Sequence, residues 1–463
     1  MKAWEFSRDL VNNVSPEKLK VADENWDLYE KLEKLEDERV KRWWKSEVAG
    51  TGIPECLIVA MIQSVENKGF YAEPAERWIE KGIQAYEKND MGELFRVTAH
   101  IKYLTTTAEK NPSSPYWQFD EFSSWDQYLE TVSFPDIVEV DDQSETYAHQ
   151  IYSGWLGKLI GSGLGSALEG FTTDQIIKLY GDVRSYVRKP ASLSNDITYE
   201  LAFLRTFEEK GYGISALDIA DEWVSSIPFA LDAEDIALRS INLGYYPPES
   251  GRLNNPFTDW VGAQMRGSIC GMVAPGDPKE ASRLAWMDGS VSHYNNGILG
   301  EVFNAIMTSR AFVQPDIRKL VEEAVNLLPA NSEYYQTISA VLTICRNSSD
   351  YMSAWRLCES LLEKYHWSHV YPNAAAEVVA LWFGDGSFDE TMHIIAMAGR
   401  EVDCNASQIA TILGIAKGEE MISDKWKLPI GDEIETYVRG MKKLSITGLA
   451  GRTVTAVKKA LRY

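Results

Sequence analysis

The stretch LGEVFNAIMTSRAF, residues 299–312, indicates the kind of fold that the chain adopts. Its large apolar residues recur every three or four positions, which would place them along one buried stripe of an α-helix. The stripe consists of Leu299, Val302, Phe303, Ile306 and Met307. A second stripe of this kind lies in ASQIATILGIAKG, residues 406–418, and consists of Ile409, Ile412 and Leu413.

Similar short amphipathic segments follow one another from Gln143 onward, joined by turns that contain glycine or proline. Alternation of apolar and polar residues, which is typical of half-buried strands, is scarce in this part of the chain. The sequence therefore predicts an all-α fold for it.

The first 140 residues are also predicted to be helical, with a charged surface rich in tryptophan. In NWDLYEKLEKLEDERVKRWW, residues 25–44, the apolar side chains of Leu28, Leu32, Leu35, Val40 and Trp43 recur at nearly helical spacing. Residues 111–136 are rich in turn-forming and aromatic residues, which is typical of a linker or an irregular cover. We therefore expect a helical N-terminal region over residues 1–140 and a second domain over residues 141–463.

The composition excludes several classes of function. The 463 residues carry a formal net charge of −22, so the surface repels phosphate backbones and a nucleic-acid partner is not expected. No apolar run has the length of a signal peptide or a membrane span, which predicts a cytoplasmic protein without a membrane partner. The five cysteines are widely scattered and lack the CxxC spacing, which argues against a disulfide framework and a zinc–thiolate site.

Three segments dense in glycine interrupt the predicted helices: residues 154–170, GWLGKLIGSGLGSALEG; residues 262–277, GAQMRGSICGMVAPGD; and residues 295–301, NNGILGE. Glycine inside a helix costs stability, so each segment needs a reason. Close packing of helices is one reason, and a backbone drawn close to a ligand is the other. Both remain open from the residues alone.

Carboxylates, hydroxyls and amides gather beside these glycines or at predicted helix starts. Glu401 and Asp403 in GREVDCNASQIATILG are separated by one residue just before a helix, and Glu169 ends the first glycine-rich segment. Two acids that lie close together raise each other's pKa unless a cation compensates. Their oxygen atoms would suit Mg²⁺, Mn²⁺ or Ca²⁺ rather than a thiophilic ion.

Two further polar groups stand at predicted helix starts: Ser194, Asn195 and Asp196 in LSNDITYELAFL, and Ser292 with His293 in DGSVSHYNNGILGE. Each has an ordinary structural explanation, because such residues commonly cap helices and a lone histidine commonly satisfies a buried hydrogen bond. A metal site built from the ends of several helices is the alternative. The residues alone leave both interpretations open.

Six segments occur in a fixed order: GWLGKLIGSGLGSALEG, SNDITYE, GAQMRGSICGMVAPGDP, ASRLAWMDGSVSHYNNGILGEVFNAIM, HVYPNAAAEVVALWFGDGSFDETM and AMAGREVDCNASQIATILG. In this order they resemble the motif series of the ADP-ribosylglycohydrolase superfamily, to which dinitrogenase-reductase-activating glycohydrolase belongs, and in particular bacterial members with a helical N-terminal extension. The resemblance covers about residues 145–420. It implies an all-α fold with a binuclear Mg²⁺ or Mn²⁺ centre, at which the metals hold the ribose diol of an ADP-ribosyl group and activate water.

The resemblance assigns the metal ligands to two motifs. It places the first on Ser194, Asn195 and Asp196, and the second on Glu401 and Asp403, followed by Cys404 and Asn405. It places the glutamate near the scissile bond on Glu169, which is then the candidate acid/base. His293, Asn296 and Gly297 would help to shape the substrate pocket together with Ser162 and Asn405.

Three positions depart from the family pattern. Asn195 stands where the family has an acid, Glu401 is longer than the usual aspartate, and Ser162 replaces a nearby acid. An asparagine oxygen and a glutamate can still bind a hard cation, so one or two Mg²⁺ or Mn²⁺ ions are expected.

The resemblance implies a metal-dependent hydrolase that cleaves the glycosidic bond at the anomeric carbon of an ADP-ribosyl or related ribosyl group. The expected partner is a small ribosyl or ADP-ribosyl substrate, and a homo-oligomer is compatible with the sequence. A protein that binds ADP-ribose or a nucleotide without catalysis, through a degenerate metal site, is the alternative. A helical interaction scaffold that uses the tryptophan-rich N-terminal region is a third.

Overall fold

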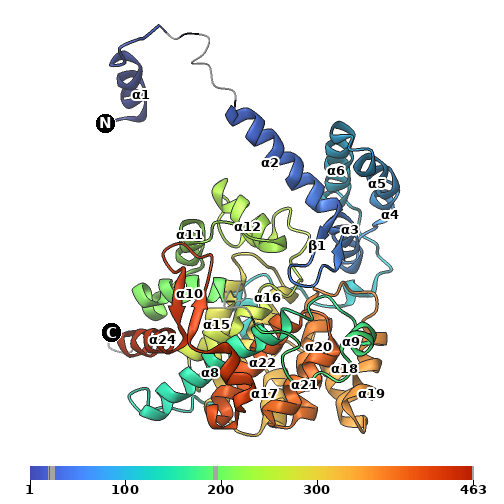
Figure 1. Cartoon of the computed structure of the whole chain (residues 1–463), viewed down its shortest axis with the longest axis vertical. Helices are drawn as coiled ribbons and strands as arrows, with labels where there is room; N and C mark the ends of the chain where they lie inside the picture. Colours follow the sequence, from blue (N-terminus) through green and yellow to red (C-terminus); the bar gives the residue numbers. More distant parts are fainter. Residues whose placement is uncertain (19, 21–26, 191–196, 461–463) are drawn as a thin grey trace.

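The protein is described by a computed structural model that covers residues 1–18, 20, 27–190 and 197–460 (Figure 1). Within these ranges the chain is largely α-helical, which confirms the predicted all-α fold. The strands named in them form two short antiparallel pairs. The first pair is β1 (Ser46–Glu47) with β2 (Pro54–Glu55), and the second is β3 (Glu433–Glu435) with β4 (Lys443–Ser445).

Two long helices pack side by side in the middle of the molecule: α8 (Glu145–Gly165) and α22 (Val402–Lys417) (Figure 1). Gly157, Gly161 and Gly165 of α8 face the backbone of α22, and a Cβ atom at any of them would collide with that backbone. The first glycine-rich segment is therefore explained in large part by close helix packing. This packing also brings the end of α8 against the start of α22.

Helix α16 (Asn296–Ala311) contains the first predicted stripe, and all five of its apolar residues are fully buried. Glu301, Asn304 and Thr308 on its other sides are buried as well. The apolar stripe alone predicts that only one face of this helix is buried. All faces are buried because other helices surround α16. The neighbours of α16 are α14 (Gly267–Val273), α15 (Pro278–Gly289), α17 (Ile317–Asn326), α18 (Glu333–Asn347), α20 (Val370–Gly384), α22 and the 3-10 turn η4 (Gln264–Arg266).

The remaining helices of the later part of the chain enclose this centre, and most of them share one continuous apolar core with it. They are α9 (Thr173–Tyr180), α10 (Thr198–Lys210), α11 (Ala216–Ser226), α12 (Asp232–Asn242), α13 (Glu249–Arg252), α19 (Tyr351–Leu361), α21 (Phe388–Ala398), α23 (Asp424–Ile430) and α24 (Ile446–Ala460), with the short 3-10 turns η3 (Gly211–Gly213) and η5 (Glu419–Met421).

The N-terminal region forms a smaller helical layer on one side of this body (Figure 1). Its helices are α1 (Ala3–Asn12), α2 (Asp27–Trp44), α3 (Leu57–Asn67), α4 (Glu73–Glu76), α5 (Ile79–Glu87) and α6 (Met91–Thr106), and the turn η2 (Pro115–Gln118) and α7 (Trp125–Thr131) follow. Ala233, Phe257 and Trp260 from the later part of the chain join its apolar core, whereas Phe122 and Tyr128 belong to the main core. The division at residue 140 stays a prediction.

Helices α1 and α2 bury little. Helix α1 has no buried residue and stands away from the body, as Figure 1 shows. Leu28, Leu32 and Leu35 of α2 are exposed, and only its last residue, Trp44, is buried. No helix in the described ranges combines the length and the apolar character that crossing a lipid bilayer requires.

Candidate metal centre and active site

The start of α22 gathers three side chains that could hold a metal ion. Potential ligand atoms of Glu401, Asp403 and Cys404 all lie within 4.8 Å of one another. Glu401 is the N-cap residue of α22, and Asp403 lies in its first turn. Acids are stabilised there by the positive end of the helix dipole. Both are nevertheless buried, with 7% and 3% of their surface exposed.

Burial makes the negative charge at this site costly. It raises the pKa of Glu401 well above its usual range, and the nearby charge of Asp403 raises it further. A hydrogen bond with Ser368 opposes this rise. A carboxylate pair in such surroundings is stabilised either by a proton or by a cation. The oxygen-rich donor set fits a hard divalent ion such as Mg²⁺ or Mn²⁺.

Two acids that the sequence did not point to add to the negative charge. The charges of Glu55 and Asp232 both raise the pKa of Glu401. Asp232 is the first residue of α12, and its own pKa is raised to about 7, by burial first and then by the charge of Glu55. The Arg42 guanidinium opposes the rise for both Glu55 and Asp232. These four acids, Glu55, Asp232, Glu401 and Asp403, are called the acidic cluster below.

The loop that carries Glu169 is tied to the residue before Glu401. The N–H of Gly170 donates to the carbonyl of Arg400 over 2.9 Å, and the N–H of Arg400 donates to the carbonyl of Phe171 over 2.9 Å. The structure therefore brings the segment of Glu169 beside the start of α22. Ser162 lies one turn before the end of α8 and is buried.

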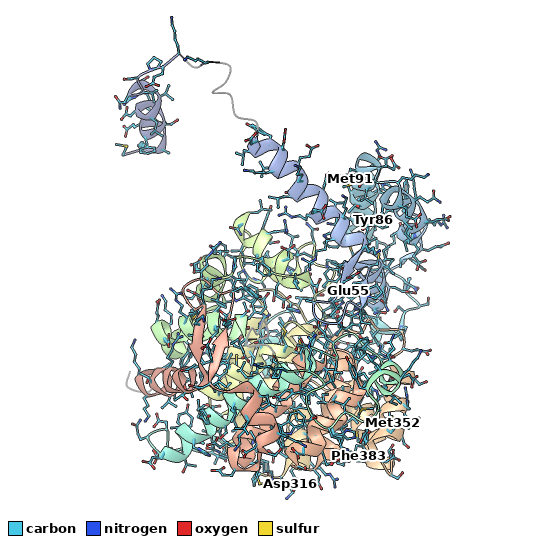
Figure 2. All side chains as sticks on the ribbon, in the orientation of Figure 1. Glu55, Tyr86, Met91, Asp316, Met352 and Phe383 are labelled. Atoms are coloured by element: carbon cyan, nitrogen blue, oxygen red, sulfur yellow. The ribbon has the colours of Figure 1, made fainter. Side chains whose placement is uncertain are left out.

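The N-terminal region covers this loop. The Thr51 hydroxyl, between β1 and β2, donates to the carbonyl of Glu169 over 2.9 Å. The guanidinium of Arg188 donates to the carbonyls of Gly50 and Ser166, each over 3.1 Å. Figure 2 shows Glu55 where the N-terminal helices meet the rest of the chain. The first 140 residues therefore contribute to the surroundings of the site.

Asn405 links α22 to α20. Its side-chain N–H donates to the side-chain oxygen of Asn373 over 2.8 Å, and Asn373 donates to the carbonyl of His369 over 2.9 Å. The Cys404 thiol lies 3.7 Å from a carboxylate oxygen of Glu401 and 3.6 Å from the sulfur of Met265. All five cysteines are free thiols. These contacts fix the orientation of the first turn of α22.

The predicted ligands Ser194, Asn195 and Asp196 lie outside the described residues. Helix α10, which follows them, is anchored to α8 by a fully buried ion pair between Lys158 and Glu200 at 3.0 Å. The Lys158 ammonium also donates to the carbonyl of Met265 over 2.8 Å. The same α8 thus packs against α22 and anchors α10.

His293 belongs to a second buried polar network, and Asn296 and Gly297 follow it as the first residues of α16. Ser292 hydrogen-bonds to the His293 ring over 2.8 Å and accepts from the Arg266 guanidinium over 3.0 Å. Arg266 is paired with Asp288, and with Glu234 at 3.2 Å. Burial and the charge of Arg266 hold the pKa of His293 well below its usual range, so the ring is neutral at pH 7. In the described chain these contacts tie His293 to Arg266.

This buried network was missed from the sequence. Arg266 is fully buried and pairs with acids from α12 and α15, which are separated from it by more than twenty residues. Only its position inside a glycine-rich segment could have suggested that it is enclosed. Glu55 and Asp232 gave no comparable signal.

Comparison with known proteins gives one clear family match. The family model described as ADP-ribosylglycohydrolase matches residues 143–458. A solved structure entitled "ADP-ribosylglycohydrolase-related protein complex" is similar to this chain, with 15% sequence identity and a TM-score of 0.49. The superposition covers 68% of this chain and 99% of the chain in that structure. No curated protein sequence matches the chain significantly.

Proposed function

Because the chain belongs to the ADP-ribosylglycohydrolase family, we propose that it is a divalent-metal-dependent hydrolase of a ribosyl glycosidic bond. The bond cleaved is the one at the anomeric carbon of an ADP-ribosyl or related ribosyl group. The family is hydrolytic and acts on ADP-ribosylated small molecules or proteins. The net charge of −22 disfavours a polyanion such as poly(ADP-ribose), which leaves a small ribosyl substrate as the better match.

The observation that carries the proposal is the buried pair of Glu401 and Asp403 at the start of α22. Their oxygen atoms lie within 4.8 Å of each other, and burial makes their charge costly without a cation. Helix α22 holds them on a rigid element, and Asn405 fixes that helix against α20. Glu401 and Asp403 would therefore hold the metal, together with Ser194, Asn195 and Asp196.

A bound divalent ion would orient the ribose diol and lower the pKa of a water molecule. Glu169 is the proposed acid/base: it would donate a proton to the leaving group as the glycosidic bond breaks. Water would bond to the anomeric carbon in place of the leaving group, and the Glu169 carboxylate would take up the proton of that water. The position of Glu169 on the loop bonded to Arg400 supports this role. Ser162 and Asn405 are proposed to lie near the substrate, and His293, Asn296 and Gly297 to shape the more distant part of the pocket.

The alternative is a protein that binds ADP-ribose without cleaving it. It is favoured by the asparagine at position 195 and by the serine at position 162, which remove two acids from the family pattern. Both proposals place the ligand beside Glu401 and Asp403. They differ in turnover alone.

Two measurements test the proposal. Calorimetry would follow ADP-ribose binding with Mg²⁺ or Mn²⁺, and release of ADP-ribose would be followed from a panel of ribosylated substrates. We expect Asp403→Asn to lose metal-linked binding and at least about 100-fold of the turnover, since removal of one electrostatic contact to a transition state commonly costs that much. The matched control is Asp316→Asn, at the N-cap of α17, where asparagine preserves the cap.

The outcomes separate the candidates. Metal-linked binding without turnover by the wild-type protein supports the non-catalytic alternative, and no binding at all supports the scaffold. Equal turnover by the wild type and Asp403→Asn would reject the site.

A further inference from the structure

A second pocket lies between the N-terminal region and the later part of the chain. Its volume is 640 Å³, which is within the range of about 300–1,000 Å³ usual for small-molecule sites. Trp43 from α2, and Lys102 and Tyr103 from α6, form its N-terminal wall. Arg239 from α12 and Arg252 from α13 belong to the wall that the later part of the chain contributes. We call it the junction pocket. No member of the acidic cluster lines it.

The charge of the junction pocket is opposite to that of the whole protein. Lys68, Lys102, Arg239 and Arg252 line it, and no aspartate or glutamate is found among the described residues of its wall. The chain has 68 acidic and 46 basic residues, so a wall with four cations and no acid is unexpected. Such a concave cationic surface attracts anions.

Contacts outside the wall neutralise only some of these cations. Arg239 is paired with Asp235 at 2.8 Å, and Arg252 with Glu249 at 3.2 Å. Lys68 donates to the carbonyl of Pro256 over 2.8 Å and to the Thr258 hydroxyl over 3.1 Å. These last two acceptors are neutral, but the charges of Asp259 and Glu121 also act on the ammonium, and burial lowers the pKa of Lys68 against their effect. Within the described chain, Lys102 is therefore the cation of the wall that carboxylates compensate least.

Lys102 is the centre of the pocket's positive charge. Its ammonium lies 3.8 Å from the centre of the Trp43 ring, and it forms no ion pair with a carboxylate of the described chain. Burial and the charge of Arg239 lower the pKa of Lys102 to about 8, against a smaller opposing effect of Asp235. Two cations held close together in a half-buried site repel each other, and an anion between them would relieve that repulsion.

The aromatic rings indicate what accompanies the anion. The Trp43 ring stacks on Phe257 at a centroid distance of 5.9 Å. Tyr103 follows Lys102 in the sequence and also lines the pocket. Lys102 and Phe257 both lie against the Trp43 ring, so the exposed Tyr103 is the ring of the wall that can bind the planar group of a ligand, and Lys and Arg together bind phosphate. We propose that the junction pocket binds a small organic phosphate with a planar ring, of which a nucleoside monophosphate is the simplest form.

The test is calorimetry of the full chain with AMP, adenosine and inorganic phosphate, in EDTA so that metal-linked binding elsewhere does not contribute. We expect saturable binding of AMP, weaker binding of phosphate, and at least a tenfold loss of AMP affinity in Lys102→Glu. Lys102→Met retains the apolar stem beside Trp43 and should show the loss without a fall in melting temperature. The matched control is Lys110→Glu, whose ammonium lies 3.7 Å from the Trp117 ring outside the pocket.

A second variant separates this pocket from the proposed active site. Asp403→Asn should bind AMP in EDTA as the wild type does. The inference is overturned if AMP shows no saturable binding up to about 1 mM, the weak end of specific affinity. It is equally overturned if Lys102→Glu and Lys102→Met bind AMP like Lys110→Glu, or if Asp403→Asn alone abolishes binding.

Discussion

The two ends of α12 lie in opposite electrostatic surroundings. Its first residue, Asp232, belongs to the acidic cluster, whereas Arg239, two turns later, lines the cationic junction pocket. A helix favours acids at its N-terminus and cations at its C-terminus, so the order of charge along α12 is the stable one. Each end, however, adds like charges from other elements: Glu55 and Glu401 at one end, and Lys102 at the other. Because each end gathers more like charge than the helix dipole requires, the acidic end suits a cation and the basic end suits an anion.

The largest effect is expected when the charge of the acidic cluster is reduced. We expect Glu401→Gln to lower Mn²⁺ affinity by at least about 100-fold, because even residues that only support a metal ligand contribute about 10- to 100-fold. The metal-free variant should be at least as stable as the wild type, because burial and the charge of Asp403 disfavour the ionised form of Glu401, which glutamine cannot adopt. Mn²⁺ titration calorimetry and thermal unfolding in EDTA measure the two effects. A variant that binds Mn²⁺ normally would contradict the assignment.

A metal ion should stabilise the acidic end and leave the cationic end unaffected. At a free Mn²⁺ concentration of 100 times the dissociation constant, the expected gain in unfolding free energy is about 2.7 kcal/mol. Chemical unfolding with and without Mn²⁺ measures it. The gain should vanish in Asp403→Asn and persist in Lys102→Met. Stabilisation of all three proteins to the same extent would point to an ion bound elsewhere.

The cationic end should respond to pH. Because an anion favours the charged form of Lys102, whose pKa in the free protein is about 8, AMP affinity should fall above that pH. The fall approaches about tenfold per pH unit until the higher pKa of the complex is reached. Calorimetry from pH 6.5 to 9.5 tests this, with Lys102→Met as the variant that should show a flat profile. A flat profile in the wild type would exclude Lys102 as the titrating group.

The smallest expected effect concerns Asp232. Its folded pKa of about 7 lies above the unfolded value of about 4, so the metal-free protein loses stability as the pH rises from 4 through 7. Because the side chain is only half-buried, we expect about 1 kcal/mol. Asp232→Asn should therefore be more stable than the wild type at pH 8 and similar to it at pH 5. Urea unfolding in EDTA at both pH values measures the difference, and an equal shift at both would assign it to packing.

Local patterns in the sequence predicted a part of this arrangement. The spacing of Leu299 to Met307 predicted a buried helix, and the acids before ASQIATILG predicted carboxylates at a helix start, where Glu401 and Asp403 lie. The glycine-rich segment 154–170 predicted close packing or a nearby ligand, and its glycines do contact the backbone of α22. Such features depend on residues within one helix or its immediate turn, so local periodicity and caps reveal them.

Other parts depend on contacts between distant segments. Glu55 and Asp232 are 177 positions apart, and each contributes to the site only because the fold brings it close enough for its charge to act on Glu401. The cationic wall is likewise shared between α6 and α12, and neither helix is unusually basic alone. Periodicity carries no information on which helix faces which. The ligands expected at 194–196 lie outside the described residues, so their assignment stays a prediction.

The glycines of α8 have a consequence for the choice of ion. Backbones in direct contact along Gly157, Gly161 and Gly165 leave little freedom for the first turn of α22 to shift outward. Mg²⁺ takes oxygen ligands at about 2.0–2.1 Å and Ca²⁺ at about 2.3–2.6 Å, so a stiff cage discriminates by ionic radius where a loop would adapt. The close packing of α8 against α22 would then make the site selective for the smaller cation, Mg²⁺, over the larger one, Ca²⁺.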